Sequence, residues 1–383
     1  METVGFGHFF AFLPLLVRDL GVAQGDAATT VGFLSTAALI AGLPLVPFWG
    51  AWADRYSRKL VVVRSAVVEA LLFLLLSQVA QIWGVFLLVP LVGLVLGNTG
   101  VMLAEITDRT PRERLGFAIS LVGTAGPLGF AVGPAIGGVL ADRYGVQILF
   151  LFDALLTAGV VAMLVLLYRE RPDRPRSALT VLALVRRSLL AVAGTPLARG
   201  VFITYFFVLL GQRMVAPFLA LFVEELQGPV MLATAVGLVA GAYGLAAAVG
   251  SPLAGMLGDQ VGYRRVLVGA IIVAALGMLI ASAVSGLLPF GVVYAALGVG
   301  FATAGSMLFT VLATGLPVDV RSAVLNLALV PLYVSGIVGS LIATSLLAAT
   351  AGDLRPLWVV GAACVGAALV PALRSGLGRR VSA

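Results

Sequence analysis

A short pattern of residues occurs twice in this chain, and its proline, first glycine and aspartate recur at a constant distance of 205 positions. The first copy consists of Pro47, Gly50, Asp54, Ser57, Arg58 and Lys59. The second copy consists of Pro252, Gly255, Asp259, Gly262, Arg264 and Arg265. Each copy ends one long apolar segment and precedes another. The repeat predicts two copies of one helical bundle, an arrangement typical of secondary transporters.

The composition excludes a soluble globular protein, because 61% of the residues are hydrophobic and only 11% are charged, whereas soluble domains carry roughly a quarter charged residues. A bilayer core of ~30 Å needs about 20 apolar residues per helix. The apolar runs therefore predict an all-α membrane protein with twelve transmembrane helices. The predicted spans are 2–18, 28–52, 60–80, 83–105, 116–140, 147–168, 199–223, 230–257, 264–285, 288–313, 322–349 and 355–374.

The net charge of +7 does not indicate a nucleic-acid partner, because the basic residues sort by side of the membrane. Three lie at external ends, at Arg18, Arg143 and Arg355, and Arg213 lies inside a span. The other twenty lie at the ends and loops predicted to be cytoplasmic. This asymmetry follows the positive-inside rule. It predicts a multi-pass protein of the bacterial cytoplasmic membrane with both termini in the cytoplasm.

The first span is short, since only about 17 residues precede Asp19, against the roughly 20 that a spanning helix needs. We expect either that the natural start lies upstream of Met1 or that the first helix is trimmed. A cleaved signal peptide is not expected, because no small-residue cleavage site follows and Pro14 interrupts the run. The single cysteine, Cys364, is expected to be a small apolar filler and supports neither a disulfide nor a metal site.

One long polar stretch, 169–199, divides the chain into a bundle of residues 1–168, a linker of residues 169–198 and a bundle of residues 199–383. The linker is predicted to end in an amphipathic helix on the cytoplasmic membrane surface. Its apolar face carries Leu179, Leu182, Val185 and Leu189, with Arg186 and Arg187 opposite.

A weaker repeat lies inside the first bundle: Ala53-Asp54-Arg55-Tyr56 ends the second span and Ala141-Asp142-Arg143-Tyr144 ends the fifth. One of these ends is cytoplasmic and the other external. An inverted three-plus-three repeat would give this pattern. A match of four residues can also arise by chance.

The loop 50–59, Gly50-Ala51-Trp52-Ala53-Asp54-Arg55-Tyr56-Ser57-Arg58-Lys59, resembles the G-x-x-x-D-R-x-G-R-[RK] signature of the major facilitator superfamily. The resemblance implies a conformational latch. In it Gly50 permits close helix approach, Asp54 meets a helix N-terminus, and the basic residues bind anionic headgroups. Ser57 replaces the usual glycine, so we expect a slightly strained turn. The second copy, with Gly255, Asp259 and Arg264, keeps the glycine and has Gln260 for the first arginine.

The fifth span contains a second family motif. Residues 129–138 read Gly-Phe-Ala-Val-Gly-Pro-Ala-Ile-Gly-Gly and resemble the G-x-x-x-G-P-x-x-G-G motif of the drug–proton antiporter branch. The resemblance implies an export function and a bent helix between the two bundles. The motif residues are Gly129, Gly133, Pro134, Gly137 and Gly138. Glycines four apart permit close packing and proline removes a backbone donor; generic small-residue packing is the alternative interpretation.

One residue of that branch is absent. Its exporters usually carry an arginine in the fourth span, but no basic residue occurs between Arg64 and Arg109. The proton-relay role of that arginine cannot be transferred to this chain, so any proton coupling must use other groups.

Ionisable residues inside spans are costly and are functional candidates by default. Arg213 and His8 fall on the seventh and first spans, which line the cavity in the resembling fold. We expect Arg213 either to bind an anionic substrate group or to form an interhelical ion pair. His8 either titrates near neutral pH or is a hydrogen-bonded interface residue. Glu69 and Asp153, on the third and sixth spans, are either proton carriers or structural partners.

The remaining cavity candidates are mostly aromatic and lie on the spans that line the cavity in the resembling fold: Phe9, Phe12, Asn98, Met102, Tyr205, Phe206, Gln212 and Phe301. Such a lining suits amphiphilic organic molecules better than sugars, which need many hydrogen-bonding side chains. Glu105 and Asp108 precede Arg109 and are expected to form local ion pairs in a solvated loop.

The sequence offers no enzyme chemistry: it has no P-loop, and one His and one Cys cannot form a metal cluster. We expect a monomeric transporter that exports hydrophobic or amphiphilic small molecules by alternating access, driven by proton antiport, without cofactor, nucleic acid or obligate protein partner. One alternative is a metabolite or sugar-type carrier of the same fold, which includes a uniporter. Another is a non-transporting membrane receptor or scaffold.

Overall fold

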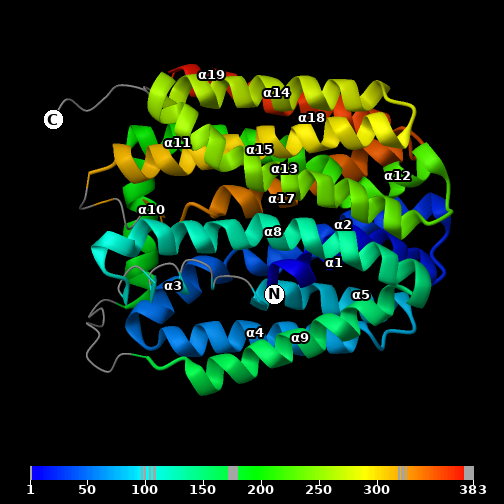
Figure 1. The fold of residues 1–383 in the computed structure, drawn as a ribbon, viewed down its shortest axis with the longest axis horizontal. Coiled ribbons are helices and arrows are strands. Elements are labelled where there is room, and N and C mark those ends of the chain that lie inside the picture. The colour runs from blue at the N-terminus through cyan, green and yellow to red at the C-terminus, as the bar shows by residue number, and fades with distance from the viewer. Residues whose placement is uncertain are drawn as a thin grey trace.

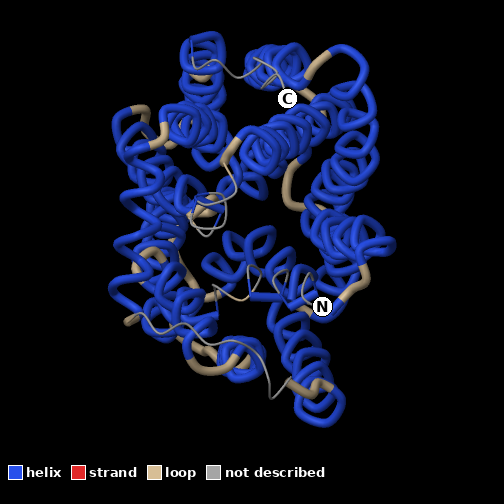
Figure 2. Tube along the Cα trace, turned by 90° about the vertical axis from the view of Figure 1, so that its left-hand side faces the viewer, coloured by secondary structure: helices blue, strands red, loops and turns tan. Residues whose placement is uncertain are grey.

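The structure is a computed structural model. It describes residues 2–95, 98, 101–102, 105–106, 109–170, 180–317, 320, 324–325 and 327–374, except for the side chains of Glu2, Gln24, Val46, Pro47, Asp54 and residues 112–124. Every regular element within these ranges is a helix (Figures 1 and 2). The predicted all-α class is therefore confirmed.

The helices before the linker, which we call the N-terminal half, run nearly parallel in Figure 1. They are α1 (Glu2–Asp19), α2 (Gln24–Gly42), α3 (Leu45–Arg55), α4 (Arg58–Leu76), α5 (Ile82–Leu88), η1 (Val89–Leu91), α6 (Val92–Val95), α8 (Arg112–Tyr144) and α9 (Val146–Leu167). The linker contributes α10 (Val181–Gly194). The C-terminal half contains α11 (Pro196–Val215), η2 (Ala216–Phe218), α12 (Leu219–Gln227), α13 (Leu232–Val261), α14 (Tyr263–Ala283), α15 (Leu287–Gly315), α17 (Val330–Ala349), α18 (Arg355–Ala367) and α19 (Leu369–Arg374).

Proline divides three of the predicted spans. The second span separates into α2 and α3 at Pro44, and the fourth separates into α5 and α6 across a 3₁₀ turn that contains Pro90. The seventh separates into α11 and α12 across η2, which contains Pro217. Proline has no N–H and its ring clashes with the preceding turn, which favours such breaks. Each of these three predicted spans is therefore divided into separate helices in the structure.

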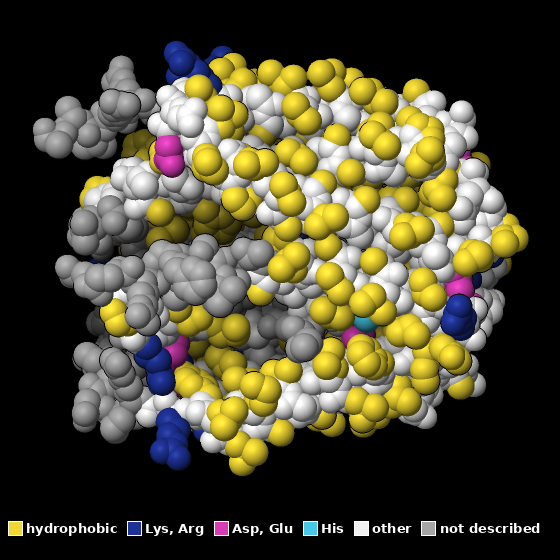
Figure 3. Space-filling model, viewed as in Figure 1, with side chains coloured by type: hydrophobic (Ala, Val, Ile, Leu, Met, Phe, Trp, Pro, Cys, Tyr) yellow, Lys and Arg dark blue, Asp and Glu magenta, His cyan; other side chains and the backbone are white. Residues whose placement is uncertain are grey.

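The molecular surface is that of a membrane protein. Eight segments among the described residues are long and apolar enough to cross a bilayer, including the joined α11–η2–α12 segment Pro196–Gln227. In Figure 3 hydrophobic side chains cover the middle of the face shown, and most charged side chains gather toward its two ends, with one acidic side chain beside the histidine between them. Exposed apolar side chains such as Leu155, which is 67% exposed, would be unfavourable in water and are favourable against lipid.

The bundle has two ends, which we name by their contents. The linker end holds α10, the loop after α3 and the C-terminal end of α19, at the left of Figure 1. The far end holds the loops that follow α1, α8 and α12, at the right. Helix α10 packs on α3 and α11 and turns Ser188 inward, whereas Leu182 and Leu189 are exposed. The predicted linker helix is thus present.

Candidate functional site

Helix α8 lies between the two halves of the molecule and packs against α1 on one side and α13 on the other. Three of its motif glycines form a row that faces α1, and the fourth faces α13. A Cβ atom on Gly129 would lie 2.0 Å from Thr3 Oγ1, and one on Gly133 would lie 3.0 Å from the carbonyl oxygen of Val4. One on Gly137 would lie 2.5 Å from the ring of His8. This row therefore lets α1 lie directly on α8.

The fourth motif glycine, Gly138, faces α13, which belongs to the other half. A Cβ atom on Gly138 would lie 2.3 Å from the carbonyl oxygen of Ala233. On the α13 side, a Cβ on Gly237 would lie 2.1 Å from the carbonyl oxygen of Pro134. These contacts involve backbone atoms, which cannot move aside as a flexible side chain can. The helix with the glycine–proline motif is thus fixed between α1 and α13.

His8 is the polar centre of the α1–α8 contact and is 2% exposed. Its Nε2 lies 2.8 Å from the carbonyl oxygen of Gly133. Its Nδ1 lies 2.9 and 3.0 Å from the two carboxylate oxygens of Asp153 on α9. Asp153 is 1% exposed, so the imidazole and the carboxylate form a buried pair that links three helices.

The partners of His8 determine where its protons lie. A carbonyl oxygen can only accept, so Nε2 carries a hydrogen and donates it to Gly133. A carboxylate also only accepts, so a second proton must lie between Nδ1 and Asp153. That proton resides on His8 as an imidazolium or on Asp153 as a carboxylic acid. Without it, a lone pair would face a carboxylate in a site that excludes water.

The sequence analysis identifies His8 and Asp153 as separate candidates. It does not predict that they pair across 145 positions. The other acidic candidate, Glu69 on α4, is 2% exposed. A Cβ atom on Gly5 of α1 would lie 3.5 Å from its Oε1. Helix α1 therefore has Glu69 on one side and the His8–Asp153 pair on another.

Arg213 lies near the end of α11 in the C-terminal half, and Gln212 beside it donates from Nε2 to the hydroxyl oxygen of Tyr243, at 2.6 Å. Gly339 of α17 would place a Cβ atom 3.3 Å from Cβ of Arg213, so the two helices are in close contact there. Four tyrosines surround the guanidinium closely enough to interact with it electrostatically: Tyr205, Tyr243, Tyr294 and Tyr333.

The other cavity candidates lie in the hydrophobic core or make local contacts. Phe9, Phe12 and Phe301 are buried in the hydrophobic core, and Phe206 packs on Phe207. Asn98 is 5% exposed and its carbonyl oxygen accepts from the N–H of Met102. Their cavity roles stay predictions.

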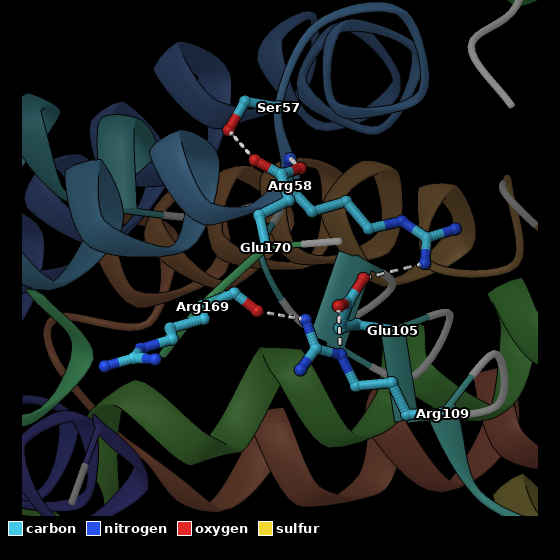
Figure 4. Close-up of polar contacts among 6 residues, drawn as sticks. All are labelled: Ser57, Arg58, Glu105, Arg109, Arg169 and Glu170. Atoms are coloured by element: carbon cyan, nitrogen blue, oxygen red, sulfur yellow. Dashed lines mark hydrogen bonds and ion pairs between the residues drawn. The ribbon is translucent and has the colours of Figure 1, made fainter. Parts of the chain in front are cut away.

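The first copy of the repeated pattern forms a compact polar cluster at the linker end (Figure 4). Arg58 is 6% exposed and its Nη1 lies 3.0 Å from Oε2 of Glu105. Arg109 pairs with the same carboxylate at 2.5 Å. Glu170 accepts from the backbone N–H of Arg58 at 2.7 Å and from the hydroxyl of Ser57 at 2.5 Å. The ion pairs expected for Glu105 are present, whereas Asp108 lies outside the described residues.

Three expectations for this loop are wrong in this structure. Arg58 is buried in an ion pair, and Lys59 donates to the carbonyl oxygen of Val165 at 2.9 Å, so neither is free for lipid headgroups. Ser57 is not strained: it is extended, and its hydroxyl caps α4 by accepting from Leu60 N. A Cβ atom on Gly50 or Gly255 would meet nothing within 4 Å, so no helix among the described residues approaches closely there.

The remaining residues of the two copies have local partners. Arg55 lies over the ring of Tyr56, 5.4 Å from its centroid, and the side chain of Asp54 lies outside the described residues. In the second copy Asp259 accepts from the Tyr263 hydroxyl, and Arg264 donates to the carbonyl oxygen of Leu373 at 2.6 Å. At Gly262 φ is +95°, which explains glycine there.

Tyr168 closes the loop cluster beyond the end of α9. The guanidinium of Arg109 lies 5.2 Å from the centroid of its ring. Burial, and then the neighbouring Glu105 carboxylate, raise the pKa of Tyr168 to about 12. Its phenol is therefore neutral at physiological pH and contributes a cation–π contact rather than a charge.

At the far end, polar contacts join the two halves. The carboxylate of Asp142 accepts from the backbone N–H groups of Ala233 at 3.1 Å and Thr234 at 2.7 Å. These are the first-turn donors of α13, whose own N-cap residue makes no side-chain bond, so Asp142 caps a helix of the other half. A second contact between the halves is the ion pair of Arg18 on α1 with Glu224 on α12. The Ala141–Tyr144 repeat pointed to Asp142, but not to this partner.

Comparison with known proteins places this architecture in a family. The family model described as Major Facilitator Superfamily matches residues 1–198 and 201–379. The chain belongs to the Major Facilitator Superfamily. The resemblance drawn from its motifs is therefore confirmed, and with it the twelve-helix fold class and the expectation that the chain is a transporter and not an enzyme.

Curated relatives in this superfamily include proteins named multidrug resistance protein MdtG. The one from Serratia proteamaculans is 33% identical over 280 residues, which cover 72% of this chain and 67% of the relative. The one from Citrobacter koseri is 33% identical over 279 residues, covering 72% and 68%.

Two solved structures share the major facilitator fold of this chain. A mutant of the nucleoside transporter NupG has a TM-score of 0.79 at 13% identity, covering 98% of this chain and 97% of the other. A bacterial homologue of the human lysosomal transporter Spinster has a TM-score of 0.70 at 14% identity, covering 97% and 92%. At these identities the likeness shows the fold alone. Membership of the Major Facilitator Superfamily makes the chain a multi-pass membrane transporter of small molecules.

Proposed function

We propose that this transporter exports hydrophobic or amphiphilic small molecules across the bacterial cytoplasmic membrane, in exchange for protons. The helix with the glycine–proline motif and the MdtG relatives support export. In this proposal residues 1–168 and 199–383 are two domains that rock about α8 and α13, and residues 169–198 link them. We place the linker end in the cytoplasm, because most basic residues lie there, and we expect a monomer.

The observation that carries the proposal is the buried pair of His8 and Asp153. It holds a proton between two helices of one half, and it is bonded to Gly133 within the helix that contacts the other half. Loss of the proton leaves a carboxylate facing an imidazole lone pair, so the contact between α1, α8 and α9 must rearrange. Movement of α8 then reaches α13, because their backbones touch at Gly138 and Gly237.

This arrangement supplies what an antiporter needs. A proton stabilises one packing of α8, and its release favours another. No arginine of the fourth span is required, since the buried pair comes from the first and sixth predicted spans. Opening of one end and closing of the other would then follow proton binding from outside and release inside.

The experiment is efflux of ethidium or Hoechst dye from drug-sensitive cells, with and without a protonophore. We expect protonophore-sensitive efflux by the wild-type protein. Asp153→Asn removes the proton site with little change in shape, so efflux against a gradient should fall at least tenfold. Downhill dye exchange in liposomes should persist, because it needs no coupling.

The matched control is Asp26→Asn, which neutralises an exposed carboxylate at the start of α2 and should leave efflux unchanged. Export would be refuted if the well-expressed wild-type protein moved no dye. Coupling by the pair would be refuted if Asp153→Asn retained wild-type, protonophore-sensitive efflux.

A further inference from the structure

Arg213 carries a permanent positive charge inside the membrane-spanning region, and the described residues provide no carboxylate partner for it. Its Nε is buried and makes no hydrogen bond. Among the described residues, the groups that interact with it electrostatically are the four tyrosines, and no aspartate or glutamate is among them. A guanidinium keeps its charge in proteins. An uncompensated charge at this depth is costly and marks a functional site by default.

The backbone beside Arg213 is also irregular. Helix α11 ends at Val215, and Pro217 in the following 3₁₀ turn lacks the N–H that would bond to the Arg213 carbonyl oxygen. Helix breaks at membrane depth are tolerated where they line a cavity, and transporters place their substrate sites at such breaks. The charge and the break are independent features of one position.

Hydrogen-bond donors and an aromatic wall adjoin the charge. Because Tyr243 accepts from Gln212 at 2.6 Å, its own O–H is available to donate. The ring of Tyr243 lies 5.0 Å from that of Tyr294, which in turn lies 6.3 Å from Trp358. The guanidinium, the phenolic donor and these neighbouring aromatic rings together suit an acidic group on an aromatic body.

We propose that Arg213 and Tyr243 bind the anionic group of an amphiphilic aromatic substrate, a carboxylate or an acid of similar shape. The inference rests on the proposed function, since it treats this region as part of the path of the exported molecule. The guanidinium takes the anion bidentately and the aromatic wall takes the body. The bound substrate then provides the negative charge that the protein lacks.

The test is a binding measurement that needs no proton gradient. Purified protein in detergent is titrated with 1-naphthoate and with 1-naphthamide, which share one aromatic body and differ in charge, and binding is followed by tryptophan fluorescence. Because a bidentate charged hydrogen bond is about twice as strong as a neutral one, we expect naphthoate to bind at least about tenfold more tightly than the amide.

Two variants assign that preference to Arg213. Arg213→Gln should bind both probes equally, and Arg213→Lys should keep part of the preference, because lysine retains the charge without the planar fork. Arg64→Gln is the matched control, since Arg64 is a half-buried arginine on α4 that lies over Trp49. It should keep the full preference. Size-exclusion chromatography of each variant verifies folding.

The outcomes separate this inference from the export proposal. Equal affinity for both probes in the wild-type protein, no binding of either, or a full preference in Arg213→Gln would each overturn the anion site. If dye efflux were present in that case, export would stand. Naphthoate binding that depends on Arg213, without any efflux, would support the site and refute export.

Discussion

At the scale of single residues, the fit of His8 depends on the absence of a side chain at Gly137. Because a Cβ there would lie 2.5 Å from the imidazole, Gly137→Ala should push the ring away from Gly133 and Asp153. We expect coupled efflux to fall about tenfold, which corresponds to roughly 1.4 kcal/mol. The measurement is the rate of dye efflux in cells that express equal amounts of protein.

Helix α8 offers its own control. Among the described residues, a Cβ on Gly126 would meet nothing within 4 Å, so Gly126→Ala should leave efflux at the wild-type rate and stabilise the helix slightly. Equal loss of activity in both variants would mean that glycine acts through helix flexibility, and would contradict the role given to the Gly137–His8 contact.

A second residue-scale prediction concerns the buried ion pair of the linker-end loop. Glu105→Gln removes the carboxylate that pairs with the guanidinium of Arg58, which is 6% exposed. Removing one partner of a buried pair costs more than the pair contributes, about 3 kcal/mol. We expect a clearly lower melting temperature in detergent, whereas Asp353→Asn, at an exposed carboxylate, should melt as the wild-type protein does. Equal melting temperatures would contradict the prediction.

At the scale of elements, the cap that Asp142 places on α13 should stabilise the closed far end. Asp142→Asn keeps the shape but replaces one of the two accepting oxygens by an NH2 group, which leaves one N–H of α13 without its acceptor, at a cost of about 1 kcal/mol. That cost shifts the ratio of closed to open molecules about fivefold. Spin labels at Tyr144 and Val230, both exposed, would report the shift as a longer distance distribution in a Cys364→Ser background.

Arg143→Gln is the companion variant, because Arg143 is the exposed neighbour of Asp142 on the same turn. Its distance distribution should match the wild-type one. An unchanged distribution in Asp142→Asn would show that the glycine contacts of α8 and α13 alone hold this end closed.

The elements were predictable to the extent that local sequence determines them. Hydropathy located the spans, and Pro90 and Pro217 carried a signal for the breaks that a reading by apolar run length overlooked. The glycine–proline motif indicated close packing. Which helix each glycine contacts, α1 for Gly133 and α13 for Gly138, depends on the positions of three helices and cannot be predicted from the motif. The pairing of His8 with Asp153 has no local signal at all, because it depends on how distant spans are arranged.

At the scale of the whole molecule, alternating access requires that the far-end contacts break in each cycle. Arg18 and Glu224 join the halves there and are mostly buried, so reversing either charge places like charges together and should hold that end open. We expect Arg18→Glu and Glu224→Arg each to reduce efflux about tenfold, whereas the double variant restores the opposite charges and should recover most of the rate. If efflux by the double variant fell to the product of the single losses, the two residues would act independently. The far end would then not be closed by this ion pair, and the closed state would depend on α8 and α13 alone.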